Sequence, residues 1–397
     1  MSGYLPPRTT TGPHSDIYTP SYQLQRADTT DNHTDVSHHW PIIPSNIIPS
    51  TKTLLTLGDP DNPIVSFAPL GFGCWPWGDV LSYGWGPSNG YDKRLDDASV
   101  TRAWKEIFRN VSPVLLDTAE HYGYTDGYSE KSIGRNWSED TTKNRPWLQV
   151  ATKFMPTPWR HPFMYPDIVY RACAGSLDRL GLGKIDIYQL HGPSYMGFWP
   201  RLETIVNALA DCYDQGKIKA VGTCNLNIEQ VKAVYTILKK RGVPYVSNQV
   251  EFSLARQDPW KTGLIENCRK LGIATIAYSP IGVGRLTGKY NGNNKPRGNR
   301  NFADVKWDKL QPIVDELLRI GEKTGKSPAA VALNWVICKG AVPIPGVKNE
   351  KQVIDCAQAL GWRLSKEDED RLDVLGLFNA PDYRQLQHVQ NWWWEQG

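Results

Sequence analysis

The segment LLDTAEHYGYTDGYSE covers residues 115–130 and contains an apolar run that stops at a carboxylate. The short β-type run VLLD, residues 114–117, ends at Asp117, and Tyr122 follows five residues later among glycines and further tyrosines. A charged group at the end of a buried strand needs a partner, because an unpaired charge away from water is costly. The segment therefore indicates that a strand end and the loop after it carry a functional site.

The same pattern of a short β-rich run followed by a helical stretch repeats along the chain. Helical spacing is clear in RLETIVNALADCYDQG and in NIEQVKAVYTILKKRG, which stops at Gly242. Strands that alternate with helices indicate βαβ units and a parallel sheet. Eight such units in roughly 310 residues predict an α/β fold of the (β/α)8 TIM-barrel type. The predicted strands are residues 65–73, 114–117, 148–154, 185–191, 219–225, 245–252, 273–280 and 341–347.

A doubly wound sheet is the competing architecture, and it favours a glycine-rich phosphate loop after the first strand. The corresponding stretch here is GFGCWPWG, residues 71–78, with Trp and Pro where small residues are needed. The closed barrel is therefore preferred. Ahead of it, TLLTLGDPDNPIVSFAPLGFG has two apolar runs around the turn residues 59–62, which predicts an N-terminal β-hairpin.

Composition narrows the class of protein. Lys plus Arg minus Asp plus Glu is 45 − 41 = +4, and the charge is dispersed, so the chain is not expected to bind nucleic acid. Seven cysteines without paired metal-type spacing favour free thiols in a reducing compartment, and no metal site is expected. The sequence contains no apolar stretch long enough to span a membrane and no signal pattern. These features predict a cytoplasmic location and no membrane partner.

The chain divides into three predicted parts. Residues 1–50 are polar and poor in periodicity, which is typical of a flexible N-terminal extension. Residues 51–376 form the barrel. Residues 377–397 form a C-terminal tail that contains Trp392, Trp393 and Trp394, and three adjacent Trp side chains need somewhere to bury. The tail is expected to dock near the barrel mouth or on a partner chain, and an oligomer stays open.

Polar residues end several of the predicted strands, and in a barrel the C-terminal strand ends converge on one area. Asp117, Lys153 and His191 end the second, third and fourth strands, so they are expected to face one pocket with Tyr122. Asp117 and Lys153 form the obvious ion pair. A lysine cation beside a phenol lowers the phenol pKa, so Tyr122 is expected to exchange protons. His191 can orient a carbonyl by a hydrogen bond or join the proton relay.

These residues resemble the aldo-keto reductase family, in the branch with plant and fungal reductases and potassium-channel β-subunits. The family motif D-T-A-x-x-Y-G stands at residues 117–123, followed by Ser129-Glu130 and Gly134. Its lysine after an A-T-K strand matches Lys153, and its L-H matches Leu190-His191. The resemblance covers residues 52–376. It implies a catalytic tetrad of Asp117, Tyr122, Lys153 and His191, and NADPH-dependent reduction of a small-molecule carbonyl.

The resemblance also implies the residues that hold NADPH/NADP+. Cys224 stands where the family has Ser beside Asn225, and Cys356 stands where it often has Asn, so both depart from the pattern. Lys348 is expected to meet the 2′-phosphate, which favours NADPH over NADH. The full implied set is Gly73, Cys74, Trp75, Asp117, Cys224, Asn225, Gln249, Tyr278, Ser279, Pro280, Ile281, Gly282, Gly284, Leu286, Gly288, Lys289, Gly346, Lys348, Gln352, Asp355 and Cys356.

Long aromatic loops are expected to form the substrate wall, because such loops set specificity. Trp75, Trp77 and Trp85 lie in the loop 74–93, and Trp199 lies in HGPSYMGFWP. The carbonyl substrate that the resemblance implies can therefore be bulky or aromatic. Core packing is the alternative for each of these Trp residues.

Two other functions compete with the carbonyl reductase. One is a cofactor-binding regulatory subunit of another protein, as the channel β-subunits suggest. The other is non-redox acid–base chemistry, a cyclisation or dehydration, on the same barrel with Tyr122 and His191. Steady turnover of free small carbonyls distinguishes the reductase from both.

Overall fold

The computed structural model describes residues 37–39, 42–59, 62–86, 90–123, 127–139, 145–157, 160, 164–193, 202–298 and 305–378. Its central feature is one sheet of eight parallel strands, in which every strand pairs with the next along the chain. A parallel bridge between Gly73 and Gly346 joins the first strand to the segment after the last, so the sheet closes on itself. The strands are β4 (Phe72–Gly73), β5 (Val114–Asp117), β6 (Leu148–Phe154), β7 (Ile185–Leu190), β8 (Ile218–Cys224), β9 (Tyr245–Glu251), β10 (Ala274–Tyr278) and β11 (Ala341–Pro343).

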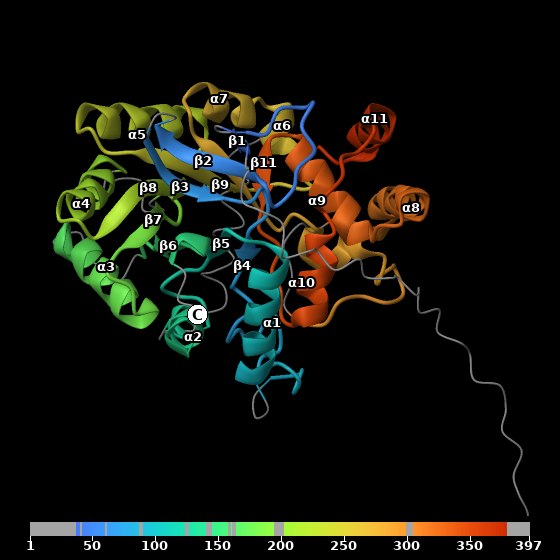
Figure 1. The fold of residues 1–397 in the computed structure, drawn as a ribbon, viewed down its shortest axis with the longest axis horizontal. Coiled ribbons are helices and arrows are strands. Elements are labelled where there is room, and N and C mark those ends of the chain that lie inside the picture. The colour runs from blue at the N-terminus through green and yellow to red at the C-terminus, as the bar shows by residue number, and fades with distance from the viewer. Residues whose placement is uncertain are drawn as a thin grey trace, which may run out of the picture. The chain divides into compact units, whose positions relative to one another are not determined.

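Helices follow the strands and lie on the outside of the sheet, as Figure 1 shows. This arrangement confirms the (β/α)8 barrel. The helices are α1 (Asp97–Asn110), α2 (Tyr128–Glu139), α3 (Asp167–Leu180), α4 (Leu202–Asp214), α5 (Ile228–Lys240), α6 (Asp258–Lys261), α7 (Leu264–Lys270), α8 (Trp307–Thr324), α9 (Pro328–Cys338), α10 (Glu350–Ala357) and α11 (Lys366–Leu375). Short 3₁₀ turns η1 (Arg145–Trp147) and η3 (Gly282–Thr287) complete the described elements.

Local sequence signals explain where these helices begin and end. At the start of α1, the Asp96 side chain accepts from the Ser99 backbone N–H, and the Ser99 hydroxyl oxygen accepts from the Asp96 backbone N–H. This pair of bonds is a capping box. Helix α5 has the same device at Asn227, and it ends just before Gly242, whose left-handed φ of 68° stops it as expected. The chain can therefore return to the next strand after each helix.

The predicted N-terminal hairpin is also present. Strands β2 (Thr53–Asp59) and β3 (Asn62–Phe67) pair antiparallel, and β1 (Ser37–His39) pairs parallel with β2. The prediction of one strand over 65–73 was wrong, because Val65–Phe67 belongs to β3 and only Phe72–Gly73 enters the barrel. Pro69 lacks an N–H for a sheet ladder, and the Ala68 N–H is already donated to Pro113 O, so the pairing breaks between the two strands.

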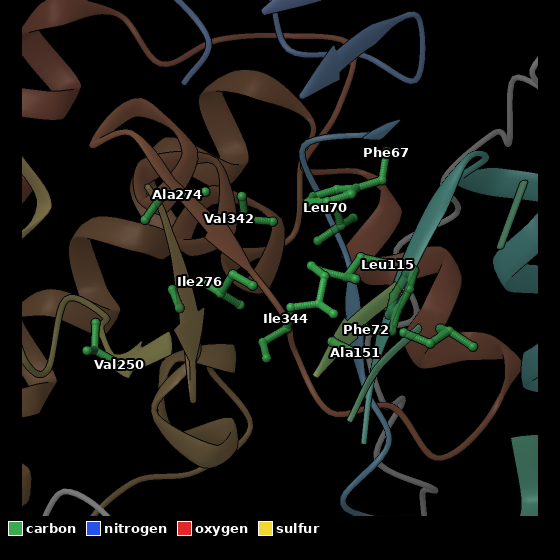
Figure 2. Packing of buried hydrophobic residues seen from close by; sticks show 14 of the residues in the cluster. Phe67, Leu70, Phe72, Leu115, Ala151, Val250, Ala274, Ile276, Val342 and Ile344 are labelled. Atoms are coloured by element: carbon green, nitrogen blue, oxygen red, sulfur yellow. The ribbon is translucent and has the colours of Figure 1, made fainter. Parts of the chain in front are cut away.

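Apolar side chains from several strands pack inside the barrel. Leu115, Ile276 and Ile344 are buried and lie between the strands in Figure 2. Each fully buried side chain of this size contributes about 1.5–3 kcal/mol relative to exposure. The packed interior fixes the strand ends, and with them the groups at the C-terminal face.

The predicted division into residues 1–50, 51–376 and 377–397 stays a prediction. Within the first part, Ile43 is buried, and Ile47 O accepts from the Arg363 guanidinium at 3.1 Å. Trp199 and the run Trp392–Trp394 lie outside the described residues. Among the described helices, none has both the length and the apolar character needed to cross a membrane.

Candidate active site

Lys153 is the centre of a buried polar cluster at the C-terminal ends of β5 and β6. Its ammonium donates to Asp117 Oδ2 at 2.5 Å, to Thr118 O at 2.9 Å and to the phenolic oxygen of Tyr122 at 3.2 Å. Strand pairing explains the contact, since Asp117 lies opposite Ala151, two residues before Lys153. Asp117, Tyr122 and Lys153, which the sequence analysis expects to face one pocket, therefore meet at the ammonium nitrogen of Lys153.

The second carboxylate oxygen of Asp117 is held by two amides. Gln189 Nε2 donates to Asp117 Oδ1 at 3.0 Å, and Gln249 Nε2 donates to the same atom at 2.7 Å. Gln189 Oε1 in turn accepts from the Cys224 thiol at 3.7 Å. A buried charge keeps its place only when its lone pairs are satisfied, and the carboxylate of Asp117, 2% exposed, meets that condition.

Burial and neighbouring charges act together on the pKa values of Lys153 and Tyr122. For Lys153 burial opposes the charge, but the charge of Asp117 and the Tyr122 phenol outweigh it and raise the pKa of Lys153. For Tyr122 burial dominates over the lowering effect of Lys153, and it raises the pKa of Tyr122 to about 12. The predicted lowering of the Tyr122 pKa was therefore wrong in direction. Tyr122 holds its proton at neutral pH, which is the state of an acid ready to donate.

His191 lies beside the Tyr122 ring, with ring centroids 5.8 Å apart and planes at 77°. Its Nδ1 atom is buried and has no hydrogen-bond partner among the described residues. Burial, and after it the charge of Lys153, lowers the pKa of His191 well below the ordinary value. The imidazole is thus neutral, and it has an unsatisfied ring nitrogen where a small molecule could bind.

A long cavity opens next to this cluster. Its lining includes Asp117, Tyr122 and His191 of this cluster, and also Lys289, Lys348, Gln352 and Asp355. The remaining predicted cofactor residues in the lining are Gly73, Trp75, Cys224, Asn225, Gln249, Tyr278, Ser279, Pro280, Ile281, Gly284 and Gly346. Residues from distant parts of the sequence therefore form one continuous surface.

Other predicted site residues do not line the cavity. Lys153 lies beneath Tyr122, fully buried. Cys74, Leu286 and Cys356 are buried, and Gly282 and Gly288 adopt positive φ within or beside the η3 turn. The sequence reasoning missed Pro76, Tyr83, Met155, Val283, Thr287, Tyr290, Ala329 and Ile344. Val283 and Thr287 lie between residues that were named, so their spacing was the available signal.

The aromatic residues of the first loop separate into two groups. Trp75 lines the cavity and stacks on Tyr122, with ring centroids 6.0 Å apart and planes at 25°. Trp77 is fully buried and donates its indole N–H to Val347 O at 2.8 Å. Trp85 is 8% exposed and packs edge-on against Tyr128. Of these three Trp residues, Trp75 is the one that lines the cavity formed by the described residues.

The backbone along the cavity is strained. Among the described non-glycine residues, those with positive φ are Asn225 (59°), Ser279 (50°) and Val283 (54°), and all three line the cavity. Such conformations cost of order 1–3 kcal/mol each and cluster where a ligand is held. These three positions are therefore candidates for contacts with a ligand.

The chemistry of the lining fits an elongated anionic ligand with an amide at one end. Close to Tyr122, the amide groups of Asn225 and Gln249 can exchange hydrogen bonds with a carboxamide. Gly73 and Gly346 pack closely against their neighbours, since a Cβ on Gly73 would lie 3.1 Å from Ile344 O and one on Gly346 would lie 3.0 Å from Pro76 Cγ. Elsewhere in the lining, Lys289 and Lys348 supply positive charge for phosphates. These residues could hold a nicotinamide dinucleotide.

The fold is a (β/α)8 barrel with a lysine-centred polar site at its C-terminal face, and the comparisons identify its family. The family model for the aldo/keto reductase family matches residues 69–376. This chain therefore belongs to the aldo-keto reductase family, as its motifs indicated.

Individual relatives and a solved structure are consistent with this family. The chloroplastic pyridoxal reductase of Arabidopsis thaliana is 37% identical over 316 residues, which cover 78% of this chain and 83% of that protein. The aldo-keto reductase yakc [NADP(+)] of Schizosaccharomyces pombe is 29% identical over 338 residues, or 79% of this chain and 91% of that one. The structure of a glycerol dehydrogenase from Gluconobacter oxydans matches with a TM-score of 0.66 at 25% identity, covering 82% of this chain and 97% of its own.

Proposed function

We propose that this protein is an NADPH-dependent reductase that converts an aldehyde or ketone to an alcohol, with Tyr122 as the general acid. The observation that supports this most directly is the Lys153 ammonium, which contacts both Asp117 and the Tyr122 oxygen beside an open cavity. The phenol is protonated at neutral pH, because burial raises its pKa to about 12. It is thus poised to give a proton to a carbonyl oxygen.

The residues of this chain divide the work between them. The cofactor, when bound, supplies a hydride to the carbonyl carbon. Tyr122 donates its phenolic proton to the carbonyl oxygen, and the resulting phenolate is stabilised by the Lys153 ammonium at 3.2 Å. Neutral His191 offers its ring N–H to the same oxygen and thereby orients the carbonyl. Asp117 keeps Lys153 charged and in place.

Cofactor binding is proposed along the rest of the cavity. Cys224, Asn225 and Gln249 would contact the carboxamide, and the segment Gly282–Lys289 would hold the pyrophosphate. Lys348 would meet the 2′-phosphate at the start of α10, where backbone N–H groups also favour anions. Its ammonium lies 5.9 Å from the centre of the Tyr83 ring, on the cavity wall. Lys348 alone would thus distinguish NADPH from NADH, because the pyrophosphate near Lys289 is common to both cofactors.

Pyridoxal is a suitable first substrate to test. A relative at 37% identity is named a pyridoxal reductase, and pyridoxal is a flat aromatic aldehyde. The wall next to the catalytic residues is aromatic, because Trp75 and Tyr83 both line it. We also propose a cytoplasmic location, which the seven free cysteines support, since thiols stay unpaired in a reducing compartment.

The deciding experiment measures NADPH consumption with pyridoxal and other aromatic aldehydes, in the native protein and in Tyr122→Phe. The matched control is Tyr245→Phe, whose hydroxyl bonds Thr223 in the barrel core, away from the cavity lining. We expect turnover in the native protein and in the control, and a loss of at least about 10²-fold in Tyr122→Phe. Binding of NADPH without turnover of any carbonyl would contradict the proposal and favour a regulatory or non-redox role.

A further inference from the structure

Asp79 lies in the first loop after β4 and accepts hydrogen bonds from three different groups. Its Oδ2 accepts from the indole Nε1–H of Trp75 at 3.0 Å. Its Oδ1 accepts from the backbone N–H of Ser82 at 2.6 Å and from that of Tyr83 at 3.1 Å. One carboxylate therefore connects two residues of the cavity wall, Trp75 and Tyr83.

This carboxylate has no salt-bridge partner among the residues that the structure describes. Burial raises the pKa of Asp79, and the hydrogen bonds from Ser82, Tyr83 and Trp75 act against that rise. A shielded acid without a cation is a costly way to build a loop, since neutral side chains can cap a turn as well. Its hydrogen bonds to Trp75 and Tyr83 of the cavity wall suggest a role in positioning that wall.

Trp75 carries the connection from Asp79 to the catalytic residues. One side of its indole stacks on the Tyr122 ring at 6.0 Å, and the Tyr83 ring packs edge-on against it at 5.4 Å and 83°. Tyr122 is also bounded by His191 at 5.8 Å and by the Lys153 ammonium, 4.7 Å from its ring centre. The indole is thus one of three groups that border the Tyr122 ring, together with His191 and Lys153.

We propose that Asp79 is a positioning residue, which acts through Trp75 to hold the Tyr122 ring in the orientation that delivers its proton. The inference rests on the proposed function, because it assigns a part in that reaction. It concerns groups of this chain alone, so it can be tested both by catalysis and by the structure of the free protein.

Two substitutions separate positioning from loop support. Asp79→Asn keeps an oxygen for the Ser82 and Tyr83 N–H groups but turns an amide NH2 toward the Trp75 N–H, where two donors repel. Trp75→Phe removes the indole N–H and keeps an aromatic ring next to Tyr122. We expect each to lower kcat for aromatic aldehydes between about 5- and 50-fold. Asp315→Asn, on α8 outside the cavity lining, should change kcat less than about twofold.

The double variant distinguishes whether Asp79 acts through Trp75 or through the loop backbone. If Asp79 acts through Trp75, Asp79→Asn combined with Trp75→Phe should be no slower than the slower single variant, within about twofold. If the two effects multiply, Asp79 acts through the loop backbone and the proposal is overturned.

A spectroscopic readout keeps the proposal independent of turnover. In protein labelled with 5-fluorotryptophan, the ¹⁹F resonance of Trp75 is the one missing from Trp75→Phe. It should shift or broaden in Asp79→Asn and stay unchanged in Asp315→Asn. An unchanged Trp75 resonance in Asp79→Asn would overturn the anchoring. A native protein that reduces no carbonyl would overturn the proposed function and the catalytic part of this inference, while the resonance would still report whether Asp79 holds Trp75.

Discussion

Replacing Lys153 by Met should destabilise the protein more than a typical core substitution. Met has nearly the shape of the lysine side chain, so the change removes a charge without creating a large cavity. Asp117 would then remain at 3% side-chain exposure, with hydrogen bonds from Gln189 and Gln249 but without a cation. The free energy of unfolding should fall because a buried carboxylate loses its counter-charge.

Breaking a buried ion pair by removing one partner costs about 3–5 kcal/mol. The two amide donors on Asp117 Oδ1 remain, which places Lys153→Met at the lower end, about 3 kcal/mol. For a barrel of this size, each 1 kcal/mol shifts the melting temperature by about 2 °C, so the expected fall is about 6 °C. The second substitution Asp117→Asn should reverse more than half of this loss, since it removes the orphaned charge.

Urea unfolding followed by circular dichroism gives the four free energies of this cycle: native protein, Lys153→Met, Asp117→Asn and the double variant. The matched control is Lys323→Met, whose ammonium is half exposed, with 51% of its side chain accessible, and pairs with Asp368. That loss should stay below about 1 kcal/mol, because Asp368, itself only 3% exposed, keeps Arg319 as a counter-charge at 2.6 Å. The reasoning is refuted if Lys153→Met costs no more than Lys323→Met, or if the double variant is as unstable as the sum of the single ones.

Three further predictions concern other parts of the barrel. Burial keeps the pKa of His191 well below its unfolded value of about 6.5, so the unfolded chain takes up the proton first as the pH falls. The free energy of unfolding should therefore decrease below about pH 6.5. His191→Gln should flatten this dependence in urea titrations between pH 5 and 8. Lys348→Met should weaken NADPH binding about tenfold or more and NADH binding little, as fluorescence titration with each cofactor will show. Gly222→Ala should cost about 1–3 kcal/mol in thermal melts, because its Cβ would lie 2.7 Å from Ser247 Oγ and 2.8 Å from Gln189 Cγ; an unchanged melting temperature would argue against this packing.

The barrel and the meeting of Asp117 with Lys153 could be predicted because both follow from periodicity and strand order. Each residue ends a short apolar run, and parallel strands bring their C-terminal ends together. The pKa direction of Tyr122 could not be predicted in the same way. It depends on how far the phenol lies from water, and that depth is set by Trp75 and His191, which are distant in sequence.

Other details depended on local competition that residue types do not reveal. Trp75 and Trp77 are two residues apart in one loop, yet the first lines the cavity and the second donates to Val347 O in the core. The strand predicted over 65–73 broke at Pro69, where the chain leaves the hairpin and enters the barrel. Tyr83 was missed because its place on the wall depends on the turn at Asp79.

The left-handed backbone at Asn225, Ser279 and Val283 has a consequence for how this protein can be improved. A glycine at any of the three positions would relieve strain, most of all at Val283, whose branched side chain is least suited to a φ of 54°. Screens that select only for heat resistance should therefore collect changes along the cavity. Such variants would resist heat longer but would lose the backbone shape that binds the ligand. Selection for stability and selection for turnover would therefore favour opposite changes at this surface.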